Sequence, residues 1–442
     1  MKVLVMGGDG FCGWAAALHL AKNNHQVLIV DDLSRRKIDT ELSINSLTPI
    51  ESIEKRIEVA NELIGNIDFI YVDVAKEYDK FHGIVDKFRP DTIVHFAEQR
   101  AAPYSMISQK ERRYTIENNI SATHNILSII VDVDPDIHLV HLGTMGVYGY
   151  NGRFGEIPEG YLDVTINQTG CGESIVYPAS PGSIYHLTKV MDHDMLQYYN
   201  SNWNLKITDL HQGVIWGTDT EETKLDERLI NRFDYDGDYG TVINRFLMQS
   251  VIGHPLTVYG TGGQTRALIH ISDMAKCIKI AIESPPKNQE KVRIFNQISE
   301  TIQLRDLAKT ISEYTDVKVQ YIDNPRNELS ENKLFVKNDG LKSLGFDPIY
   351  LKDGLFDEIR NIVEKYKDRV IKEKNLPKKT LEIEGWSVIS VNSGRAGNFY
   401  FYNSLYWIND VICLNSIFAP KLARILQKCK SSYLYKMFHI KL

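Results

Sequence analysis

A glycine-rich loop between an apolar strand and a helix constrains the fold of this chain more than any other feature. Residues 3–6 are all apolar, and they lead directly into Gly7, Gly10 and Gly13, which follow the spacing G-x-x-G-x-x-G. Glycines here allow a tight turn, let backbone N–H groups approach a pyrophosphate, and leave room for the next helix to pack. The helix expected over residues 14–21 points its positive end at that phosphate. The loop predicts a dinucleotide site, although by itself it also fits a turn without a ligand.

An acidic residue at the end of the second expected strand supports the dinucleotide site. That strand covers residues 26–31 and ends in Asp31, 18 residues after Gly13. A carboxylate at this place can accept both ribose hydroxyls and repels a 2′-phosphate, which predicts NAD. Arg35 and Arg36 follow closely and could instead favour NADP, so that alternative stays open.

Length and composition bound the number of domains and the class of partner. The chain has 442 residues, 43% of them hydrophobic, so two or three domains with real cores are expected. A net charge of −6 gives no reason to expect nucleic acid as a partner. The five cysteines show no C-x-x-C spacing, so we expect no disulfide framework and no metal, and a reducing cytoplasm fits. The first expected strand begins at residue 2, so no leader peptide is expected.

Alternating strands and helices over the first 150 residues predict an α/β fold with a doubly wound parallel sheet of the Rossmann type. Further strands are expected at 67–72, 91–96 and 137–142, and helices within 42–64, at 114–130 and from 183. We divide the chain into an NAD-binding domain that includes the catalytic helix, a smaller mixed α/β region that binds the substrate and partly returns to the first domain, and a C-terminal extension of unknown role: residues 1–210, 211–365 and 366–442.

Polar residues gather after the third and fourth expected strands. Glu98, Gln99 and Arg100 follow the fourth strand, at the edge where ligands bind in open α/β sheets. His95 is interpreted as a strand-end histidine with satisfied hydrogen bonds. Asp73 follows the third strand, where a carboxylate can meet an adenine amino group or cap the next helix, and both interpretations stay open.

A tyrosine and a lysine four residues apart form the candidate catalytic pair. Tyr185 and Lys189 share one face of an expected helix. An ammonium group near a phenol stabilises the phenolate and lowers the pKa of the phenol, as a general base near neutral pH requires. This pattern is common by chance, and a surface pair is the alternative. A hydroxyl at Thr144, on a preceding strand end, and the glycine loop favour the catalytic interpretation.

Taken together, these residues resemble the extended short-chain dehydrogenases/reductases that modify nucleotide sugars, over roughly residues 1–370. Longer strings narrow the resemblance to the UDP-sulfoquinovose synthase family. These strings are GGDGFCGW at 7–14, HFAEQRAAPYSM at 95–106, LGTMGVY at 142–148, YHLTK at 185–189, HQGV at 211–214, GGQTR at 262–266 and FNQ at 295–297.

The resemblance implies an enzyme that combines UDP-glucose with sulfite through a tightly held NAD. The sugar is oxidised at C4, water leaves across C5 and C6, sulfite adds, and C4 is reduced again. Tyr185 would take the O4 proton, Lys189 would hold down its pKa and orient the ribose, and Thr144 would bind O4. Asn119 would support Lys189 through the backbone.

The resemblance implies that sugar 4,6-dehydratases carry an Asp-Glu pair after the threonine, for the elimination step. This chain departs from that pattern. Met145 and Gly146 stand there instead. The candidates to take the C5 proton are Tyr185, acting twice, and His186. The resemblance also implies a glutamate where this chain has Val147, which puts any role of that glutamate in doubt.

Sulfite is an anion and needs donors beside C6. Arg100 and His186 are the candidate cations, and Gln99 and Tyr104 the candidate neutral donors. Arg100 could instead contact the NAD pyrophosphate, as a lysine does in related epimerases.

The resemblance implies two sets of binding residues. The cofactor set is Gly7, Gly10, Phe11, Cys12, Gly13, Asp31, Asp32, Arg35, Arg36, Asp73, Val74, Phe96, Ala97, Arg100, Asn119, Tyr185, Lys189, Gln212 and Val214. The substrate set is Gln99, Arg100, Tyr104, Thr144, Gln212, Thr257, Tyr259, Gln264, Arg266 and Arg326, the last two suited to a pyrophosphate.

Beyond about Tyr366 the resemblance stops. Residues 367–379 are charged and read as a linker or a solvated helix end. Basic residues from Lys421 onward could lie on an anionic membrane, but we expect an extension without a part in catalysis. Related enzymes pair through the helix that bears the tyrosine, so a homodimer is expected. Another NAD-dependent UDP-sugar epimerase or dehydratase, and a non-catalytic NAD-binding regulator, are the alternative functions.

Overall fold

The structure is a computed structural model that describes residues 1–149, 155–165, 172–324, 330–353 and 356–375, together with five short strands between 380 and 412. The chain divides into two compact units, Met1–Pro377 and Lys378–Leu442. The candidate site lies within the first unit.

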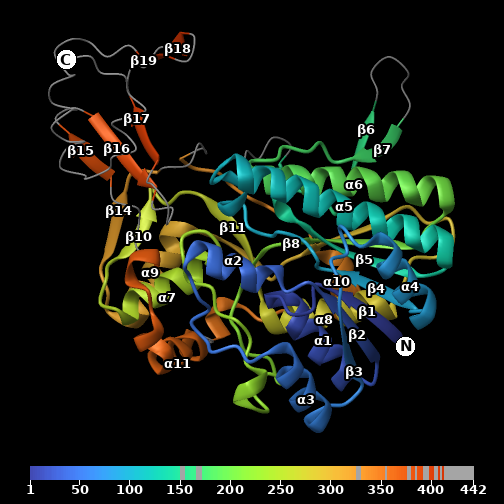
Figure 1. Ribbon diagram of the computed structural model, residues 1–442. Coiled ribbons are helices and arrows are strands. Elements are labelled where there is room, and N and C mark those ends of the chain that lie inside the picture. The colour runs from blue at the N-terminus through green and yellow to red at the C-terminus, as the bar shows by residue number, and fades with distance from the viewer. Residues whose placement is uncertain are drawn as a thin grey trace. The chain divides into compact units, whose positions relative to one another are not determined.

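A seven-stranded parallel sheet forms the centre of the first unit and confirms the doubly wound fold (Figure 1). Its strands lie in the order β3-β2-β1-β4-β5-β8-β12, and every neighbouring pair is parallel. The strands are β1 (Lys2–Met6), β2 (Gln26–Asp31), β3 (Ile67–Tyr71), β4 (Thr92–His95), β5 (His138–Thr144), β8 (Ile207–Gln212) and β12 (Arg293–Gln297). The strand order reverses between β1 and β4, so a crevice for ligands is expected at the carboxyl ends of these two strands.

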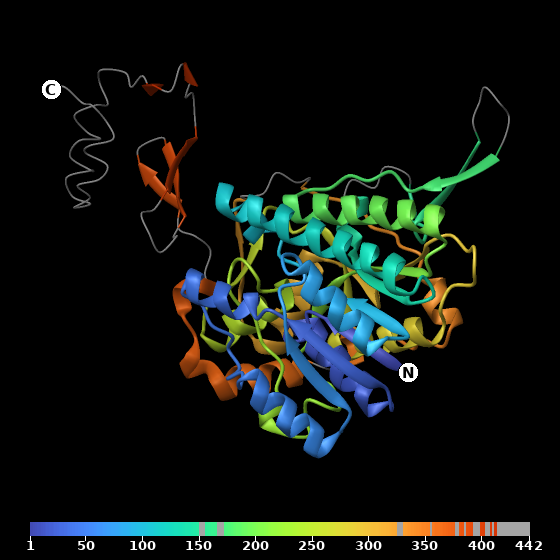
Figure 2. The same cartoon turned by 45° about the vertical axis from the view of Figure 1, so that its right-hand side comes forward.

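Helices cover both faces of the sheet. The face with α1 (Phe11–Lys22), α3 (Ile53–Leu63) and α8 (Ile271–Glu283) buries one apolar cluster, and the face with α4 (Tyr78–Phe88), α5 (Gln109–Val133) and α6 (Ile184–Trp203) buries another. Figures 1 and 2 both show α5 and α6 side by side over the sheet. This arrangement fixes α6, which carries the tyrosine and lysine, close to β5 and β8.

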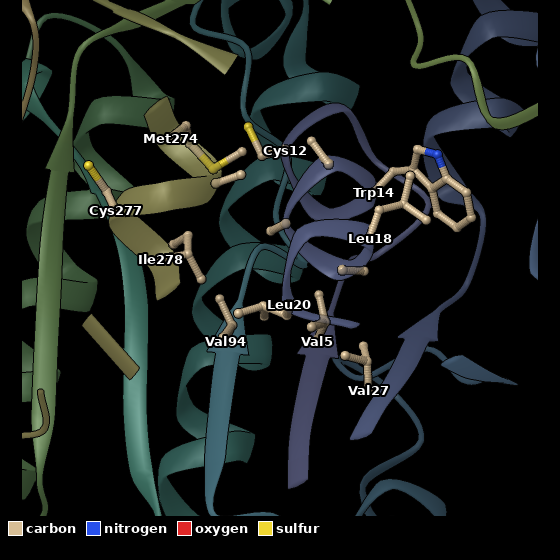
Figure 3. Close-up of a cluster of buried hydrophobic side chains, with 14 of the residues drawn as sticks. Val5, Cys12, Trp14, Leu18, Leu20, Val27, Val94, Met274, Cys277 and Ile278 are labelled. Carbon is tan, nitrogen blue, oxygen red and sulfur yellow. The ribbon is translucent and has the colours of Figure 1, made fainter. Parts of the chain in front are cut away.

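The alternation of side chains along β1 explains these two layers. Val3 and Val5 belong to the cluster with α1 and α8, whereas Leu4 and Met6 belong to the opposite cluster. Figure 3 shows the first cluster, in which side chains of α1 and α8 lie over β1, β2 and β4. Almost every residue of α1 is buried, as expected for a helix that is apolar on all sides.

The chain between β8 and β12, and the chain after β12, build a smaller mixed α/β region around its own apolar cluster. The elements are a three-stranded sheet, a parallel pair and three helices: β9 (Val214–Trp216), β11 (Thr265–His270) and β13 (Glu300–Gln303); β10 (Leu256–Tyr259) and β14 (Val319–Ile322); and α7 (Val242–Val251), α9 (Leu304–Thr315) and α11 (Phe356–Tyr366). The strand β12 returns to the central sheet, while the predicted boundary at residue 210 stays a prediction.

Insertions complete the first unit. Two helices, α2 (Ser34–Leu42) and α3, separate β2 from β3, where the sequence predicts at least one. A hairpin of β6 (Tyr161–Thr165) and β7 (Gly172–Val176) precedes α6. The short helices α10 (Asp339–Ser343) and α12 (Lys372–Asn375) lie near the end of the unit.

The segment at 367–379, predicted as a linker or solvated helix end, is described as far as residue 375. It follows the end of α11 and many of its residues are exposed, but Arg369, Ile371 and Asn375 are bonded to the rest of the first unit. Arg369 donates from Nε to the Leu47 carbonyl at 2.8 Å, and the Ile371 N–H donates to the Tyr235 hydroxyl at 2.9 Å. Asn375 donates from Nδ2 to the Tyr235 carbonyl at 2.8 Å. These hydrogen bonds fasten the charged segment to the first unit.

The second unit contains an antiparallel sheet and a strand pair within its described part. These are β15 (Thr380–Ile383), β16 (Trp386–Val391) and β17 (Asn398–Tyr402), and β18 (Trp407–Ile408) with β19 (Val411–Ile412). The basic residues from Lys421 lie outside the described residues. In the part of the chain that is described, no helix has the length and apolar character to cross a bilayer.

Candidate active site

The glycine loop brings β1 and α1 unusually close to the loop after β4. Gly7 has a φ of +79°, and a Cβ on it would lie 2.7 Å from the carbonyl carbon of Phe96. A Cβ on Gly13 would lie 2.1 Å from the Gly7 carbonyl oxygen. Only glycine fits either position, and without side chains here the backbone at the N-terminus of α1 lines a cleft. This open backbone fits the pyrophosphate of a dinucleotide.

A cleft lies at the carboxyl ends of β1, β2 and β4, as the strand order predicts. Most of the predicted cofactor residues line it, with two of the predicted substrate residues. They are Gly7, Gly10, Phe11, Cys12, Gly13, Asp31, Asp32, Arg35, Asp73, Val74, Phe96, Ala97, Gln99 and Arg100. Asp9, Glu98, Tyr114, Asn118 and Tyr239 also line the cleft.

Asp31 has the geometry of a ribose-binding carboxylate. Its two oxygens accept the backbone N–H groups of Asp9 at 2.9 Å and Leu33 at 2.7 Å, which fixes the side chain at the cleft. Burial and the neighbouring Asp9 carboxylate raise the pKa of Asp31 to about 7. Each oxygen keeps a lone pair for a ribose hydroxyl.

Arg35 and Arg36, which leave NADP open as an alternative cofactor, are both paired with carboxylates. Arg36 does not line the cleft but binds the buried Asp9 at 2.6 and 2.8 Å, and Arg56 binds the same carboxylate at 2.6 Å. Arg35 binds Asp234 at 3.0 Å and stacks on Tyr239, with 3.7 Å from its guanidinium carbon to the ring centroid. Because a 2′-phosphate would have to displace these partners, the geometry favours NAD.

Asp73 fits both interpretations of the sequence. Its Oδ1 accepts the N–H groups of Ala75 and Lys76, each at 3.1 Å, and its Oδ2 pairs with the Lys76 ammonium at 2.8 Å. It caps the turn before α4 and also lines the cleft.

Arg100 lies in the cleft next to a second carboxylate. Its guanidinium pairs with Asp234, and its side chain is 31% exposed. Asp234 also pairs with Arg232 at 3.2 Å, and these cations lower the pKa of Asp234 against the effect of burial. An anion that binds Arg100 must therefore compete with Asp234.

Tyr185 and Thr144 meet at the start of α6. The Ser183 hydroxyl caps this helix by accepting the His186 N–H at 3.1 Å, and hydrogen bonding by Thr144 is among the influences that lower the pKa of Tyr185. Burial raises the pKa of Tyr185 to about 12, although Lys189 lowers it. The expected low pKa is therefore wrong for this state of the site, because desolvation outweighs the ammonium charge.

Lys189 is buried and held by a carboxylate that the sequence analysis did not assign to it. Its Nζ lies 2.8 Å from Oε2 of Glu98 and 3.3 Å from Nε2 of His141. Burial lowers the pKa of Lys189, but Glu98 and Asp192 reverse this shift and the pKa is raised.

A buried polar network continues from Lys189 beneath α6. His141 and Asp209 pair at 2.8 Å, because the parallel register of β5 and β8 places them side by side. Asp209 also receives His193 at 3.1 Å and His211 at 2.9 Å, and these imidazoles lower its pKa well below the ordinary value against the effect of burial.

The side chain of Asn119 binds the loop after β4 and α6, while its support of Lys189 through the backbone stays a prediction. Its side chain accepts the Gln99 N–H at 2.8 Å and donates to the Gln99 carbonyl at 3.0 Å and to the Thr188 hydroxyl at 3.1 Å. It therefore fastens the loop after β4, while the neighbouring Asn118 lines the cleft.

His186 takes the space that a side chain after Met145 would need. A Cβ on Gly146 would lie 2.2 Å from Cδ2 of His186, and the His186 ring lies 5.2 Å from the Tyr185 ring. Val147 is buried in an apolar cluster with Met145. An imidazole thus stands beside the catalytic tyrosine, at the place where the dehydratase pattern has a carboxylate.

Apart from Gln99 and Arg100, the described residues of the predicted substrate set lie outside the cleft, as does Val214 of the cofactor set. Gln212 donates to Gln297 at 3.1 Å, Thr257 exchanges two hydrogen bonds with Gln249, and Tyr104 packs against Tyr239. The remaining residues lie on or beside β9, β10 and β11, or outside the described residues in the case of Arg326: Val214, Tyr259, Gln264, Arg266 and Arg326. The buried Gln264 side chain has no hydrogen-bond partner among the described residues.

His95 has the predicted satisfied environment. Its Nε2 lies 3.1 Å from the Thr123 hydroxyl, and burial lowers its pKa to about 3.

The residues that the sequence analysis missed are Asp9, His141, Asp192, Asp209, Asp234 and Tyr239. A signal existed for His141, a histidine that stands between the apolar residues Val140 and Leu142 of an expected strand.

Comparison with known proteins shows the family of this chain. The model of the NAD dependent epimerase/dehydratase family matches residues 3–296. A chloroplastic UDP-sulfoquinovose synthase of Spinacia oleracea is 43% identical over 381 residues, which cover 85% of this chain and 78% of the relative. A UDP-sulfoquinovose synthase of Sulfolobus acidocaldarius is 38% identical and covers 86% of this chain and 97% of its own.

A solved structure supports the fold. The UDP-glucuronic acid 4-epimerase of Bacillus cereus, in complex with UDP-glucuronic acid and NAD, has a TM-score of 0.60 at 20% identity. The match covers 82% of this chain and 100% of the epimerase.

Proposed function

The chain belongs to the NAD dependent epimerase/dehydratase family and, within it, to the UDP-sulfoquinovose synthases, and we propose that it converts UDP-glucose and sulfite to UDP-sulfoquinovose. The observation that carries the proposal is the placement of the His186 ring, which lies 5.2 Å from the Tyr185 ring and against Gly146, where no carboxylate stands. This arrangement suits oxidation at C4 together with a step at C5 and C6 that differs from a plain dehydration.

The cleft residues would hold the cofactor. The backbone at Gly7 and Gly13 would face the pyrophosphate, Asp31 would accept the ribose hydroxyls, and Asp73 would lie near the adenine. Bound NAD supplies a reversible oxidation at the sugar C4, so that the cofactor ends the cycle as it began.

Tyr185 and Thr144 would bind the sugar O4 between them. As C4 becomes a ketone, Tyr185 in its phenolate form accepts the O4 proton, and the resulting phenol returns it when the alcohol forms again. The neighbouring ketone makes the C5 proton acidic. His186 or Tyr185 takes this proton and passes it to the C6 hydroxyl, which leaves as water, and C5 regains a proton from bisulfite when sulfite adds. Since the His186 ring lies against Gly146, it is the better placed of the two for this step.

Sulfite would add at C6 of the resulting enone. We propose Arg100, His186 and Gln99 as its donors, because all three side chains belong to the cleft or to the tyrosine's surroundings. Arg100 is exposed enough to exchange Asp234 for a bound anion.

Mass spectrometry of UDP-glucose incubated with the protein tests the proposal. We expect a sulfonated nucleotide sugar only when sulfite is present. His186→Ala should lower its formation, whereas His124→Ala, which changes an exposed histidine of α5, should not. UDP-galactose in both incubations, without a sulfonated product, would contradict the proposal.

We further propose a homodimer formed through α5 and α6, in a cytoplasmic compartment. Leu187, Met191 and Tyr198 are 37%, 38% and 58% exposed and share one face of α6, which supports an apolar interface. The thiols of Cys12 and Cys277 are unpaired, as expected in a reducing compartment. Light scattering should give a dimer that Met191→Glu dissociates and Lys87→Glu on α4 leaves intact. A monomeric wild type would contradict the dimer.

A further inference from the structure

Glu98 is a buried carboxylate for which the proposed chemistry has no use. It lies in the loop after β4, and its side chain is only 3% exposed. Its Oε2 lies 2.8 Å from the Lys189 ammonium, which is itself 4% exposed. Two opposite charges therefore form a direct ion pair in the interior, next to the tyrosine.

Three elements of the fold fix the position of Glu98. Its Oε1 accepts the Thr123 hydroxyl of α5 at 3.4 Å and lies 3.3 Å from Nε2 of His95 on β4. The same oxygen lies 3.4 Å from Nε2 of His141 on β5. The position of the Glu98 carboxylate therefore does not depend on Lys189 alone, because its second oxygen makes contacts of its own.

We propose that Glu98 is a positioning residue, whose carboxylate fixes the Lys189 ammonium beside Tyr185 and offsets the positive charge that the phenol would otherwise experience. Glu98 would act through Lys189 and would not touch the sugar.

The charged groups around the tyrosine support this role. Burial raises the pKa of Tyr185, Lys189 and Arg100 lower it, Glu98 raises it, and the hydrogen bond to Thr144 lowers it. The His186 imidazole is the other titratable group on the same turn. Glu98 is the carboxylate that opposes the two cations at the phenol.

The ion pair stays charged over the physiological pH range. Burial alone would raise the pKa of Glu98, but Lys189 and the two imidazoles lower it to about 2. The pKa of His95 is lowered to about 3 by burial, so this ring is neutral. Burial and Lys189 lower the pKa of His141, but its carboxylate neighbours raise it to about 10. Burial and Glu98 raise the pKa of Asp192, 3.9 Å from Lys189, to about 6.

This role rests on the proposed function in one respect. A phenol that must return its proton to O4 at the end of each cycle needs to remain a good acid and a good base. An ammonium without a counter-ion would shift this balance toward the phenolate, and Glu98 opposes that shift.

The titration of Tyr185 tests the proposal without UDP-glucose or sulfite, so the result does not depend on the proposed reaction. Phenolate absorbance at about 295 nm is recorded for the wild type and for Glu98→Gln, each against its own Tyr185→Phe partner, up to about pH 10.5. We expect the pKa of Tyr185 to fall by about one unit in Glu98→Gln, which gives roughly eightfold more phenolate at that pH.

Asp192→Asn is the matched control, because it removes a buried carboxylate that lies 3.9 Å from the Lys189 ammonium, whereas Glu98 lies 2.8 Å from it. We expect its Tyr185 to titrate as in the wild type. An unchanged titration in Glu98→Gln, or an equal shift in Asp192→Asn, would overturn the proposal. Circular dichroism at each pH verifies that the variants are folded.

A second variant covers the case in which Glu98→Gln does not fold. Glu98 lines the cleft, so Glu98→Ala opens a space that formate can reach. We expect formate, and not formamide, to return the Tyr185 titration of Glu98→Ala toward that of the wild type. Equal effects of formate and formamide would overturn the proposal.

Discussion

The cofactor side and the catalytic side of the cleft are built in different ways. On the cofactor side, Gly7, Gly13 and Asp31 come from one continuous strand–helix–strand segment, and their spacing alone determines their geometry. On the catalytic side, Glu98, His141 and Lys189 come from three separate segments and meet only because β4, β5 and α6 are neighbours. The cofactor side is therefore a local sequence motif, whereas the geometry of the catalytic side depends on how the whole sheet is assembled.

Replacement of the Tyr185 phenol should show the largest difference between the two sides, because it should lower product formation with little change in the binding of NAD. Tyr185→Phe removes the proton acceptor, and we expect formation of the sulfonated product to fall by about 10²–10⁴-fold. Binding of NAD, measured by calorimetry, should change little, because Tyr185 is not among the residues that line the cofactor cleft. Tyr198→Phe, at an exposed position of the same helix, is the control. A comparable loss of NAD affinity in Tyr185→Phe would show that the two sides are not separable.

A methyl group in the glycine loop should disrupt the backbone packing on which the cofactor side of the cleft depends. The Cβ of Gly13→Ala would lie 2.1 Å from the Gly7 carbonyl oxygen, so we expect the free energy of unfolding to fall by about 3 kcal/mol. NAD binding should be lost with it. Gly83→Ala in α4 is the matched control, because its Cβ meets no atom within 4 Å. Urea unfolding measures both, and equal stabilities would refute the close approach.

The buried polar network beneath α6 should contribute to the free energy of unfolding rather than to the affinity for NAD. Asp209→Asn removes the charge that three histidines share, and we expect a loss of about 2 kcal/mol in the free energy of unfolding at pH 7. Because the pKa of Asp209 is lowered in the folded protein, its contribution is present above the unfolded pKa and is lost as the pH falls through the folded pKa. The difference between variant and wild type should shrink below about pH 4. Asp163→Asn, at an exposed position of β6, should be neutral.

The smallest expected effect is the pH dependence of cofactor binding. With a pKa of about 7, Asp31 is mostly protonated at pH 6 and mostly ionised at pH 8, and only the carboxylate accepts both ribose hydroxyls. The affinity of the cofactor-free protein for NAD should therefore rise roughly tenfold from pH 6 to pH 8. Asp31→Asn should flatten this dependence, and a dependence that persists in the variant would assign it to another group.

Sequence reasoning succeeded where the spacing of residues determines the geometry. The alternation of strands and helices predicted the parallel sheet, and the glycine loop predicted the cleft that Gly7, Gly10 and Gly13 line. Tyr185 and Lys189 share a helix, so their proximity also followed from the sequence.

Sequence reasoning failed where a contact depends on how distant elements pack. The pairing of Glu98 with Lys189 requires the position of α6 on the sheet, and the pairing of His141 with Asp209 requires the register of β5 and β8. The high pKa of Tyr185 has the same origin, because burial is a property of the packed helix and not of the pair. Likewise, no local pattern predicts that Asp9 binds Arg36.

The central claim is that the chain oxidises and re-reduces C4 of one sugar while sulfite is added at C6. Incubation with UDP-glucose that carries deuterium at C4, together with sulfite, tests it most directly. We expect a sulfonated nucleotide sugar that keeps the deuterium at C4. A sulfonated product that has lost the label, or a labelled product without the sulfonate, would contradict it.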